Sequence, residues 1–413
     1  MPLIEALLLL LVLSRVLGEI VARFGQPVMI GEILAGVLLG PSVLNSIQYN
    51  TEIKTIASLG VLLLVFIAGM EMDPGVLWHS VRGRGAWVSA AGFVVPLLFG
   101  LVVGWLFGLD QTRTVFIGLC IAITALPVSV RILMDLGKLQ TEIGQKIVSA
   151  AVANDVASLL ALGIILDLNS GAGNRGAFFK SVGWTLGKAL VFMTVVFLAA
   201  RLAKRYSMGR LLRPGGALER FFRKLKGKET LFAVVLVFVI AFASFSEFLG
   251  LDFVVGAFFG SMLLSHQLLG RDNFENIQKT ATNVTMGFLG PIFFAAIGLE
   301  FDIWALRNWK LVAAILVASF AGKILGGYLG GRLARMKGEE SWALGVGLNG
   351  RGVMELVIAN VALTNGFIGR GLFTVLVLMA VLTTLITPFL LKRAFDKMPT
   401  LPMVSEREEA LAS

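Results

Sequence analysis

The feature that most constrains this chain is a carboxylate in the middle of an apolar stretch. Asp155 lies in the run Ser149-Ala-Ala-Val-Ala-Asn-Asp-Val-Ala-Ser158, within a segment long enough to cross a bilayer. A charge at the bilayer centre costs about 3 kcal/mol on insertion scales, and such groups usually bind ions, relay protons or pair with a buried cation. A matching cation, Lys323, is central in the apolar stretch from Leu311 to Gly331. Two opposite charges at membrane depth predict a transporter.

The composition is that of a membrane protein. Hydrophobic residues make up 57% of the chain and charged residues 15%, and the mean hydropathy is +0.85. Such a chain could not keep a soluble surface. Strands of a membrane β-barrel would give alternating segments of about 10 residues, whereas the apolar runs here are continuous for about 20 residues. The composition therefore predicts an all-α polytopic bundle.

The net charge of +10 does not indicate a nucleic-acid partner, because ten Lys and Arg residues gather between Arg201 and Lys228. By the positive-inside rule this segment is expected to be a cytoplasmic loop. The single cysteine, Cys120, excludes a disulfide framework. The first apolar stretch has no basic region before it, so we expect a spanning helix there and not a cleaved signal peptide.

The apolar runs predict thirteen transmembrane helices. Their expected ranges are 3–23, 27–45, 53–73, 85–107, 113–135, 143–166, 178–202, 230–248, 251–269, 284–302, 309–331, 341–363 and 371–393. With the amino terminus outside, the basic segment falls inside and the outer loops hold only Lys54, Arg113, Arg175, Lys180, Arg307, Lys310 and Arg370. We therefore expect the amino terminus outside and residues 396–413 as a short cytoplasmic tail.

An internal repeat joins the two halves of the chain. Ile67-Ala-Gly-Met-Glu-Met-Asp73 closes the third expected helix, and Ala296-Ile-Gly-Leu-Glu-Phe-Asp302 closes the tenth. Upstream, Glu32-Ile-Leu-Ala-Gly36 resembles Asp252-Phe-Val-Val-Gly256. Both matches join helices seven apart, so the two copies are expected to have opposite orientations in a 6 + 1 + 6 plan. Inverted repeats of this kind are typical of secondary transporters.

Two of the expected helices are interrupted at corresponding places. The fifth contains Thr124-Ala-Leu-Pro-Val-Ser129, in which the proline removes a backbone donor and disfavours helix at Leu126. The twelfth contains Gly345-Val-Gly-Leu-Asn-Gly-Arg-Gly352, with four glycines in eight residues. Broken backbone at this depth is tolerated where it is buried or lines a cavity. Freed carbonyls there can coordinate a cation.

The polar residues of these helices are the candidate site. Asp155 is expected to bind a cation or a proton, the alternative being a structural acid. Asn154 offers a carbonyl oxygen or an amide donor but cannot titrate. Ser158, one turn on, is either a further oxygen ligand or a packing serine. Lys323 is too central to snorkel and is expected to neutralise or hydrogen-bond the core. Its helix has a small-residue face formed by Gly322, Gly326, Gly327, Gly330 and Gly331.

Arg351 and Glu355 are one turn apart in the twelfth expected helix. They form either a structural pair or, together with Glu71, a charge network that organises the core. A second pair with this spacing, near the inner end of the fifth helix, is interpreted as an ion pair and consists of Arg131 and Asp135.

Other chemistries find no support. Gly345-Val-Gly-Leu-Asn-Gly350 matches the dinucleotide fingerprint formally, but that motif requires a preceding strand in a soluble βαβ unit. The two histidines, His79 and His266, are far apart in sequence and give no zinc spacing. No nucleophile–base pair occurs. We therefore expect neither an enzyme nor a cofactor.

The chain resembles the monovalent cation/proton antiporter superfamily, in particular the Kef-type and NapA-like sodium/proton exchangers. The likeness covers nearly all of residues 1–395. It rests on several motifs in the right order: Gln26-Pro-Val-Met-Ile-Gly-Glu-Ile-Leu-Ala-Gly-Val-Leu-Leu-Gly-Pro41, Ala150-Ala-Val-Ala-Asn-Asp155, Gly290-Pro-Ile-Phe-Phe294 and Gly322-Lys-Ile-Leu-Gly-Gly327. The resemblance implies crossing unwound stretches in helices 5 and 12. It also implies a mobile core (about 85–166 and 309–393) and a dimerising scaffold (about 3–73 and 178–302).

The resemblance also assigns roles to single residues. It implies that Asp155 is the ion-binding aspartate, that Thr124 belongs to the unwound fifth helix and that Lys323 is the core lysine. Asn154 stands where the NapA-like group has a second aspartate, and Asn-Asp is the pairing of electroneutral members. Those members more often carry arginine where Lys323 sits. Arg351 matches the arginine of the twelfth helix, although Val353 stands where an acid usually follows.

The expected function is secondary antiport of Na⁺ for H⁺ by an elevator-type movement, with Asp155 and Thr124 as ligands of the cation. We expect an electroneutral cycle in a homodimer that serves pH homeostasis in a bacterial inner membrane or its equivalent. The alternatives are K⁺/H⁺ antiport of the Kef type, without a nucleotide-binding regulatory domain in this chain, and a cation channel. The sequence does not choose between Na⁺, K⁺ and Li⁺.

Overall fold

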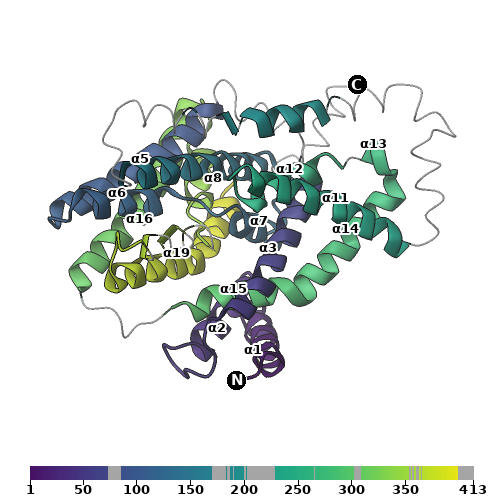
Figure 1. The fold of residues 1–413 in the computed structure, drawn as a ribbon, viewed down its shortest axis with the longest axis horizontal. Helices are drawn as coiled ribbons and strands as arrows, with labels where there is room; N and C mark the ends of the chain where they lie inside the picture. The colour runs from purple at the N-terminus through teal and green to yellow at the C-terminus, as the bar shows by residue number, and fades with distance from the viewer. Residues whose placement is uncertain are drawn as a thin grey trace. The chain divides into compact units, whose positions relative to one another are not determined.

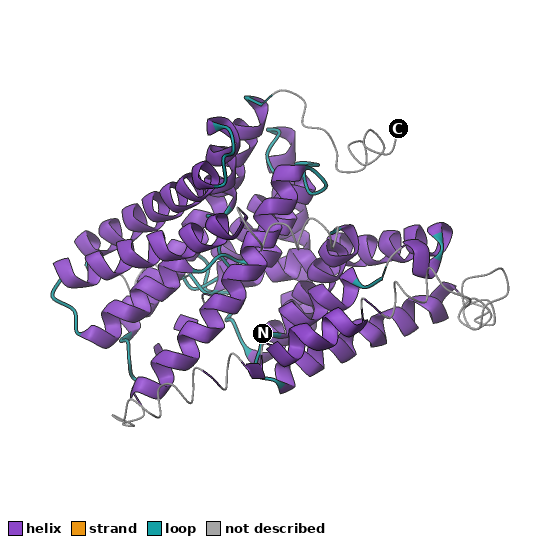
Figure 2. Ribbon diagram, turned by 90° about the horizontal axis from the view of Figure 1, so that it is seen from above, coloured by secondary structure: helices purple, strands orange, loops and turns teal. Residues whose placement is uncertain are grey.

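In the computed structural model of the 413-residue chain, most of the described residues are helical (Figures 1 and 2). The described residues are 1–72, 85–169, 183, 187–188, 190–199, 201, 228–264, 266–301, 308–352, 355, 358–359, 362–363 and 365–398. No strand occurs among them, which agrees with the predicted all-α class. The chain divides into two compact units.

The larger unit comprises Met1–Gly60, Asp73–Ser158 and Leu289–Ser413. Its described helices, which include parts of α3 and α8, are α1 (Leu3–Arg23), α2 (Met29–Leu39), α3 (Thr51–Glu71), α5 (Gly85–Leu106), α6 (Gln111–Ala122), α7 (Leu126–Asp135), α8 (Glu142–Asn169), α15 (Gly290–Leu299), α16 (Trp309–Leu333), α17 (Gly338–Gly347) and α19 (Arg370–Asp396).

The smaller unit comprises Val61–Met72 and Leu159–Phe288, and so takes the ends of α3 and α8. Its other described helices are α11 (Lys228–Phe248), α12 (Phe253–Met262), α13 (His266–Leu269) and α14 (Arg271–Val284). Glycines pack its helices closely. The Cβ of a side chain at Gly256 would lie 2.6 Å from Ser246 Cβ of α11.

Seven described helices are long and apolar enough to cross a membrane, by length and composition. They are Thr51–Glu71, Gly85–Leu106, Gln111–Asp135, Glu229–Phe248, Arg271–Leu299, Trp309–Leu333 and Arg370–Asp396. Three shorter apolar helices are Met29–Leu39, Leu190–Ala199 and Phe253–Met262. The count of thirteen spans, the inverted repeat and the division into core and scaffold remain predictions, because parts of several expected helices lie outside the described residues.

One helix begins well before the hydropathy pattern predicts. The expected range was 284–302, but the helix starts at Arg271 and runs through α14, a π-helical turn (Thr285–Leu289) and α15 to Leu299. Its first turns are amphipathic, with Phe274, Ile277 and Ala281 buried and polar residues on the other face. Mean hydropathy does not mark such a segment as continuous with an apolar span.

Helix α16 packs closely against α5 and α17 through glycines on two of its faces. Gly322, Gly326 and Gly330 lie against α5, where a Cβ at Gly326 would be 2.6 Å from the Ala91 carbonyl oxygen. On another face, a Cβ at Gly331 would be 2.8 Å from Ser341 Cβ of α17. The small-residue face predicted from the sequence is therefore confirmed. Close packing on both faces places the Lys323 side chain, carried by the same helix, deep among its neighbours.

This packing gives a first prediction. We expect Gly326→Ala to destabilise the protein by about 1–3 kcal/mol, because the added methyl group must push α16 away from the α5 backbone. The matched control is Gly371→Ala in α19, where no atom lies within 4 Å of the added Cβ. Thermal unfolding of the two purified variants in detergent compares them. Equal melting temperatures would contradict the close packing of α16.

Candidate functional site

The two interruptions predicted from the sequence are present, and they bind each other. Helix α6 ends at Ala122 and α7 starts at Leu126, with Pro127 in its first turn. Helix α17 ends at Gly347, and residues 348–352 are not helical. The Ala125 N–H donates to the Gly350 carbonyl at 3.0 Å. The two breaks are therefore hydrogen-bonded backbone to backbone.

Two hydroxyl groups of the fifth helix bind freed carbonyls of the twelfth. Thr124 Oγ1 donates to the Leu348 carbonyl at 3.1 Å, and Ser129 Oγ donates to the Gly347 carbonyl at 3.4 Å. A helix that stops leaves its last carbonyls without intrahelical partners. In a bilayer core these groups must be satisfied within the protein. The hydroxyl groups of Thr124, just before α7, and of Ser129 in α7 satisfy carbonyls at the end of α17 in this way.

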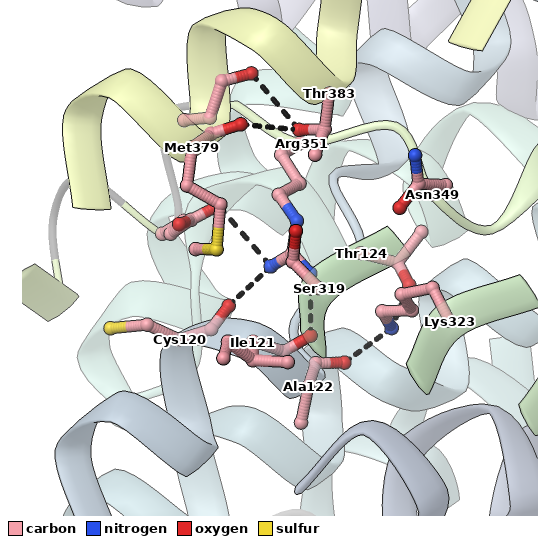
Figure 3. Close-up of polar contacts among 12 residues, drawn as sticks. Cys120, Ile121, Ala122, Thr124, Ser319, Lys323, Asn349, Arg351, Met379 and Thr383 are labelled. Atoms are coloured by element: carbon pink, nitrogen blue, oxygen red, sulfur yellow. Dashed lines mark hydrogen bonds and ion pairs between the residues drawn. The ribbon is translucent and has the colours of Figure 1, made fainter. Parts of the chain in front are cut away.

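The freed carbonyls at the end of α6 are bound by two buried cations. Arg351 donates from Nη1 to the Cys120 carbonyl at 2.5 Å and from Nη2 to the Ile121 carbonyl at 2.7 Å. Lys323 Nζ donates to the Ala122 carbonyl. Figure 3 shows both head groups directed at this helix end. The carbonyl end of a helix carries partial negative charge, so the two cations also interact favourably with its dipole.

Lys323 uses all three of its ammonium protons. Besides Ala122, its Nζ donates to the Gly92 carbonyl of α5 at 3.1 Å and to Thr124 Oγ1 at 2.6 Å. The side chain is fully buried. It therefore hydrogen-bonds the core and does not snorkel. Three elements of the larger unit meet at this one ammonium group.

Arg351 also contacts Glu355, as their spacing predicts. Its Nη1 lies 3.5 Å from Glu355 Oε2, and both side chains are fully buried. The Arg351 backbone is held by α19, where Thr384 Oγ1 donates to the Arg351 carbonyl at 2.7 Å and accepts from its N–H at 3.3 Å. The arginine is thus both paired with an acid and fixed at its backbone.

Helix α8 brings the polar pair Asn154 and Asp155 to the break of the fifth helix. Asn154 Nδ2 donates to Thr124 Oγ1 at 3.3 Å, and both Asn154 and Asp155 are buried. Ser158 Oγ donates to the Asn154 carbonyl at 2.7 Å, so its proton is committed to its own helix. Asn154, Thr124 and Lys323 therefore belong to one hydrogen-bonded buried cluster, and Asp155 follows Asn154 in the same helix and is buried as well.

The Glu71 carboxylate accepts a hydrogen bond from Gln278 Nε2 at 2.7 Å, within the smaller unit. Its membership of the charge network with Arg351 and Glu355 remains a prediction.

One buried ion-pair group is larger than the sequence analysis predicts. Arg131 pairs with Asp135 at 2.9 Å, as expected, and it also pairs with Glu32 of α2 at 3.3 Å. The Arg131 guanidinium lies 5.5 Å from the centre of the Phe294 ring. Glu32 and Arg131 are 99 positions apart, so no local spacing relates them. The group ties α7 to α2 inside the larger unit.

Comparisons with known proteins identify the family. The family model described as "Sodium/hydrogen exchanger, transmembrane" matches residues 7–397. The chain belongs to this family. It is therefore a multi-pass integral membrane protein of the monovalent cation/proton antiporter superfamily, which confirms the resemblance stated above.

Curated relatives match over nearly the whole of this chain. The Na⁺/H⁺-K⁺ antiporter GerN of Bacillus cereus is 28% identical over 390 residues, covering 94% of this chain and 95% of the relative. The probable Na⁺/H⁺ antiporter GerT of the same organism is 31% identical, covering 94% and 98%. Among solved structures, the sodium proton antiporter MjNhaP1 of Methanocaldococcus jannaschii matches with a TM-score of 0.67 at 16% identity, covering 94% of this chain and 96% of that one. This structural match concerns the fold alone.

The capping of α6 gives a second prediction. We expect Arg351→Lys to destabilise the protein by about 1–3 kcal/mol, because one ammonium group cannot reproduce the two parallel bonds to Cys120 and Ile121 and a buried carbonyl is left unsatisfied. The matched control is Arg370→Lys at the exposed start of α19. Thermal unfolding in detergent measures the difference. If Arg351→Lys unfolds at the same temperature as Arg370→Lys, the guanidinium is not needed to hold the break.

Proposed function

We propose that this protein is a secondary antiporter that exchanges a monovalent cation, Na⁺ in preference to others, for H⁺. The observation that carries the proposal is Asp155, a buried carboxylate on α8 next to Asn154, whose amide binds Thr124 at the junction of the two broken helices. The relatives support it, since the names of GerN and GerT both describe sodium and proton antiport. A carboxylate in this position is an ordinary device for binding ions at membrane depth.

Exchange follows from competition for one carboxylate. Asp155 binds either a proton or a dehydrated cation, and a hard monovalent cation prefers oxygen ligands. The charge of the site is then the same whichever ligand it carries. The loaded forms of the site can cross and the empty, charged form cannot, so inward movement of one ion is tied to outward movement of the other.

The fixed cations set the charge that moves with Asp155. Lys323 and Arg351 are hydrogen-bonded to the backbone of α6 and are proposed to keep their protons throughout the cycle. Asn154, beside Asp155, cannot titrate. One proton then exchanges for one cation on Asp155, and no net charge crosses. This is the basis of the proposed electroneutral cycle.

The proposed movement is of the elevator type. The proposed core, at about 85–166 and 309–393, carries Asp155 past a scaffold that dimerises. The amino terminus is proposed to lie outside and the carboxyl terminus in the cytoplasm. The continuity of hydrogen bonds between α5, α6, α16 and the two breaks supports movement of the core as one body. The proposed place of work is a bacterial inner membrane or its equivalent, and the proposed role is pH homeostasis.

A K⁺/H⁺ antiporter is the second candidate. The printed name of GerN includes potassium as well as sodium. The same carboxylate chemistry serves either ion, because the order of preference depends on the number and spacing of the oxygen ligands. Measuring transport rate against the concentration of each alkali cation separates these two candidates. A cation channel, the other alternative, would conduct cations without a proton gradient.

The third prediction tests the carrier site. We expect Asp155→Asn to abolish cation-driven dissipation of a pH gradient in proteoliposomes, because the variant has no carboxylate to exchange a proton for a cation. The protein should still fold, since an amide replaces the carboxylate at the same volume. The control is Asp396→Asn, at the exposed end of α19, which should transport like the wild type. Wild-type exchange by Asp155→Asn would remove Asp155 from the mechanism.

The fourth prediction concerns stoichiometry. In solid-supported-membrane recordings, the wild type is expected to move protons against sodium without current. Asn154→Asp adds a second titratable group beside Asp155, and sodium-driven currents should appear. The double variant Asn154→Asp with Asp155→Asn is the control, and it should be silent. Sustained wild-type currents that vanish with Asp155→Asn would refute electroneutrality.

A further inference from the structure

A second polar side chain at the junction of the breaks is not used by the function proposed above. Asn349 lies in the non-helical segment after α17 and is fully buried. Its neighbours on both sides bind the break of the fifth helix. The Leu348 carbonyl accepts from Thr124 Oγ1 at 3.1 Å, and the Gly350 carbonyl accepts from the Ala125 N–H at 3.0 Å. The backbone on both sides of Asn349 is therefore hydrogen-bonded to the segment around Thr124.

The orientation of the Asn349 amide is fixed by α19. Its Nδ2 donates to Thr387 Oγ1 at 3.1 Å. The Thr387 hydroxyl donates its own proton to the Thr383 carbonyl at 2.6 Å, so it can only accept from Asn349. A flipped amide would bring two acceptors together, which excludes the alternative assignment of oxygen and nitrogen. The oxygen must face away from Thr387, and Figure 3 shows it on the side of Thr124.

The Asn349 oxygen is a buried acceptor with no donor. It accepts no hydrogen bond from any residue that the structure describes. A buried polar atom in this condition is unfavourable and is usually explained by a functional partner.

With these hydrogen bonds in place, the Thr124 hydroxyl oxygen cannot bind a cation. A hydroxyl has one proton and two lone pairs. The proton goes to Leu348, and the lone pairs accept from Lys323 Nζ at 2.6 Å and from Asn154 Nδ2 at 3.3 Å. No lone pair remains for a cation. Thr124 therefore acts as a joint between helices, and a side-chain ligand from this junction must come from another residue.

We propose that Asn349 Oδ1 is a ligand of the transported alkali cation, supplied from the break of the twelfth helix and complementing Asp155 on α8. This inference rests on the proposed antiport function. An amide oxygen attracts a dehydrated cation through its dipole, but it does not bind a proton at neutral pH. Asn349 thus favours the cation over the proton in their competition for Asp155. It also helps to select among Na⁺, K⁺ and Li⁺.

The test measures dissipation of an imposed pH gradient in proteoliposomes, with NaCl, KCl and LiCl titrated separately. Asn349→Ala removes the oxygen. Its apparent KM for the preferred cation should rise about tenfold, on the scale of one lost polar contact, with the maximal rate largely kept. Thr374→Val is the matched control, because its hydroxyl donates within α19 to the Arg370 carbonyl at 3.0 Å and takes no part in orienting the Asn349 amide. Its KM should stay near that of the wild type.

The outcomes separate the two proposals. If the wild type shows no exchange with any of the three cations, the antiport function fails, and the Asn349 role fails with it. If the wild type exchanges and Asn349→Ala keeps its KM for all three, only the Asn349 role is overturned. Equal increases in KM for Asn349→Ala and Thr374→Val also overturn it, because the loss then does not depend on the Asn349 oxygen.

A second variant keeps the test decisive if Asn349→Ala does not fold. Asn349→Asp keeps an oxygen at the position and adds a charge, so the apparent cation affinity should become more strongly dependent on pH and the order of Na⁺, K⁺ and Li⁺ should change. Cation-dependent stabilisation against heat, measured with the same three salts on the purified protein, gives a readout without turnover. An unchanged ion order in both measurements would overturn the role of Asn349.

Discussion

The structure of the candidate site depends on how the end of α6 is satisfied. Breaking a helix at membrane depth exposes carbonyls that no water can reach. Arg351 and Lys323 bind the last three of them, so two charges that would be costly alone become partners of a helix end. The same contacts bring α16 and the break of the twelfth helix onto α6. Without these contacts the break at the end of α6 would leave buried carbonyls unsatisfied.

The other break is satisfied by neutral donors. Thr124, Ser129 and the Ala125 N–H bind the carbonyls that follow α17, and Thr384 of α19 holds the backbone at Arg351. One break therefore receives positive charge and the other receives hydroxyl and amide groups. Negative charge near the junction then comes from Glu355, which is paired with Arg351, and from Asp155 of α8.

Sequence reasoning predicts the parts of this site that have local causes. Pro127 and the glycines from Gly345 to Gly352 mark the breaks, and the spacing of Arg351 and Glu355 marks their contact. Which carbonyl each cation binds depends on helix packing, which no window of sequence contains. The pairing of Glu32 with Arg131 is hidden for the same reason. Sequence alone also cannot show that every hydrogen-bonding site of the Thr124 hydroxyl is used, because its partners come from α8, α16 and the twelfth-helix break.

The geometry at Lys323 limits what can replace it. Its three N–H bonds diverge as a tripod toward Gly92, Ala122 and Thr124, which come from three different parts of the chain. A guanidinium group is flat, and its donors spread within one plane. Arginine at this position would have to leave one corner of the tripod and seek another acceptor. A chain with arginine at this position would therefore need a different set of acceptors to close this junction.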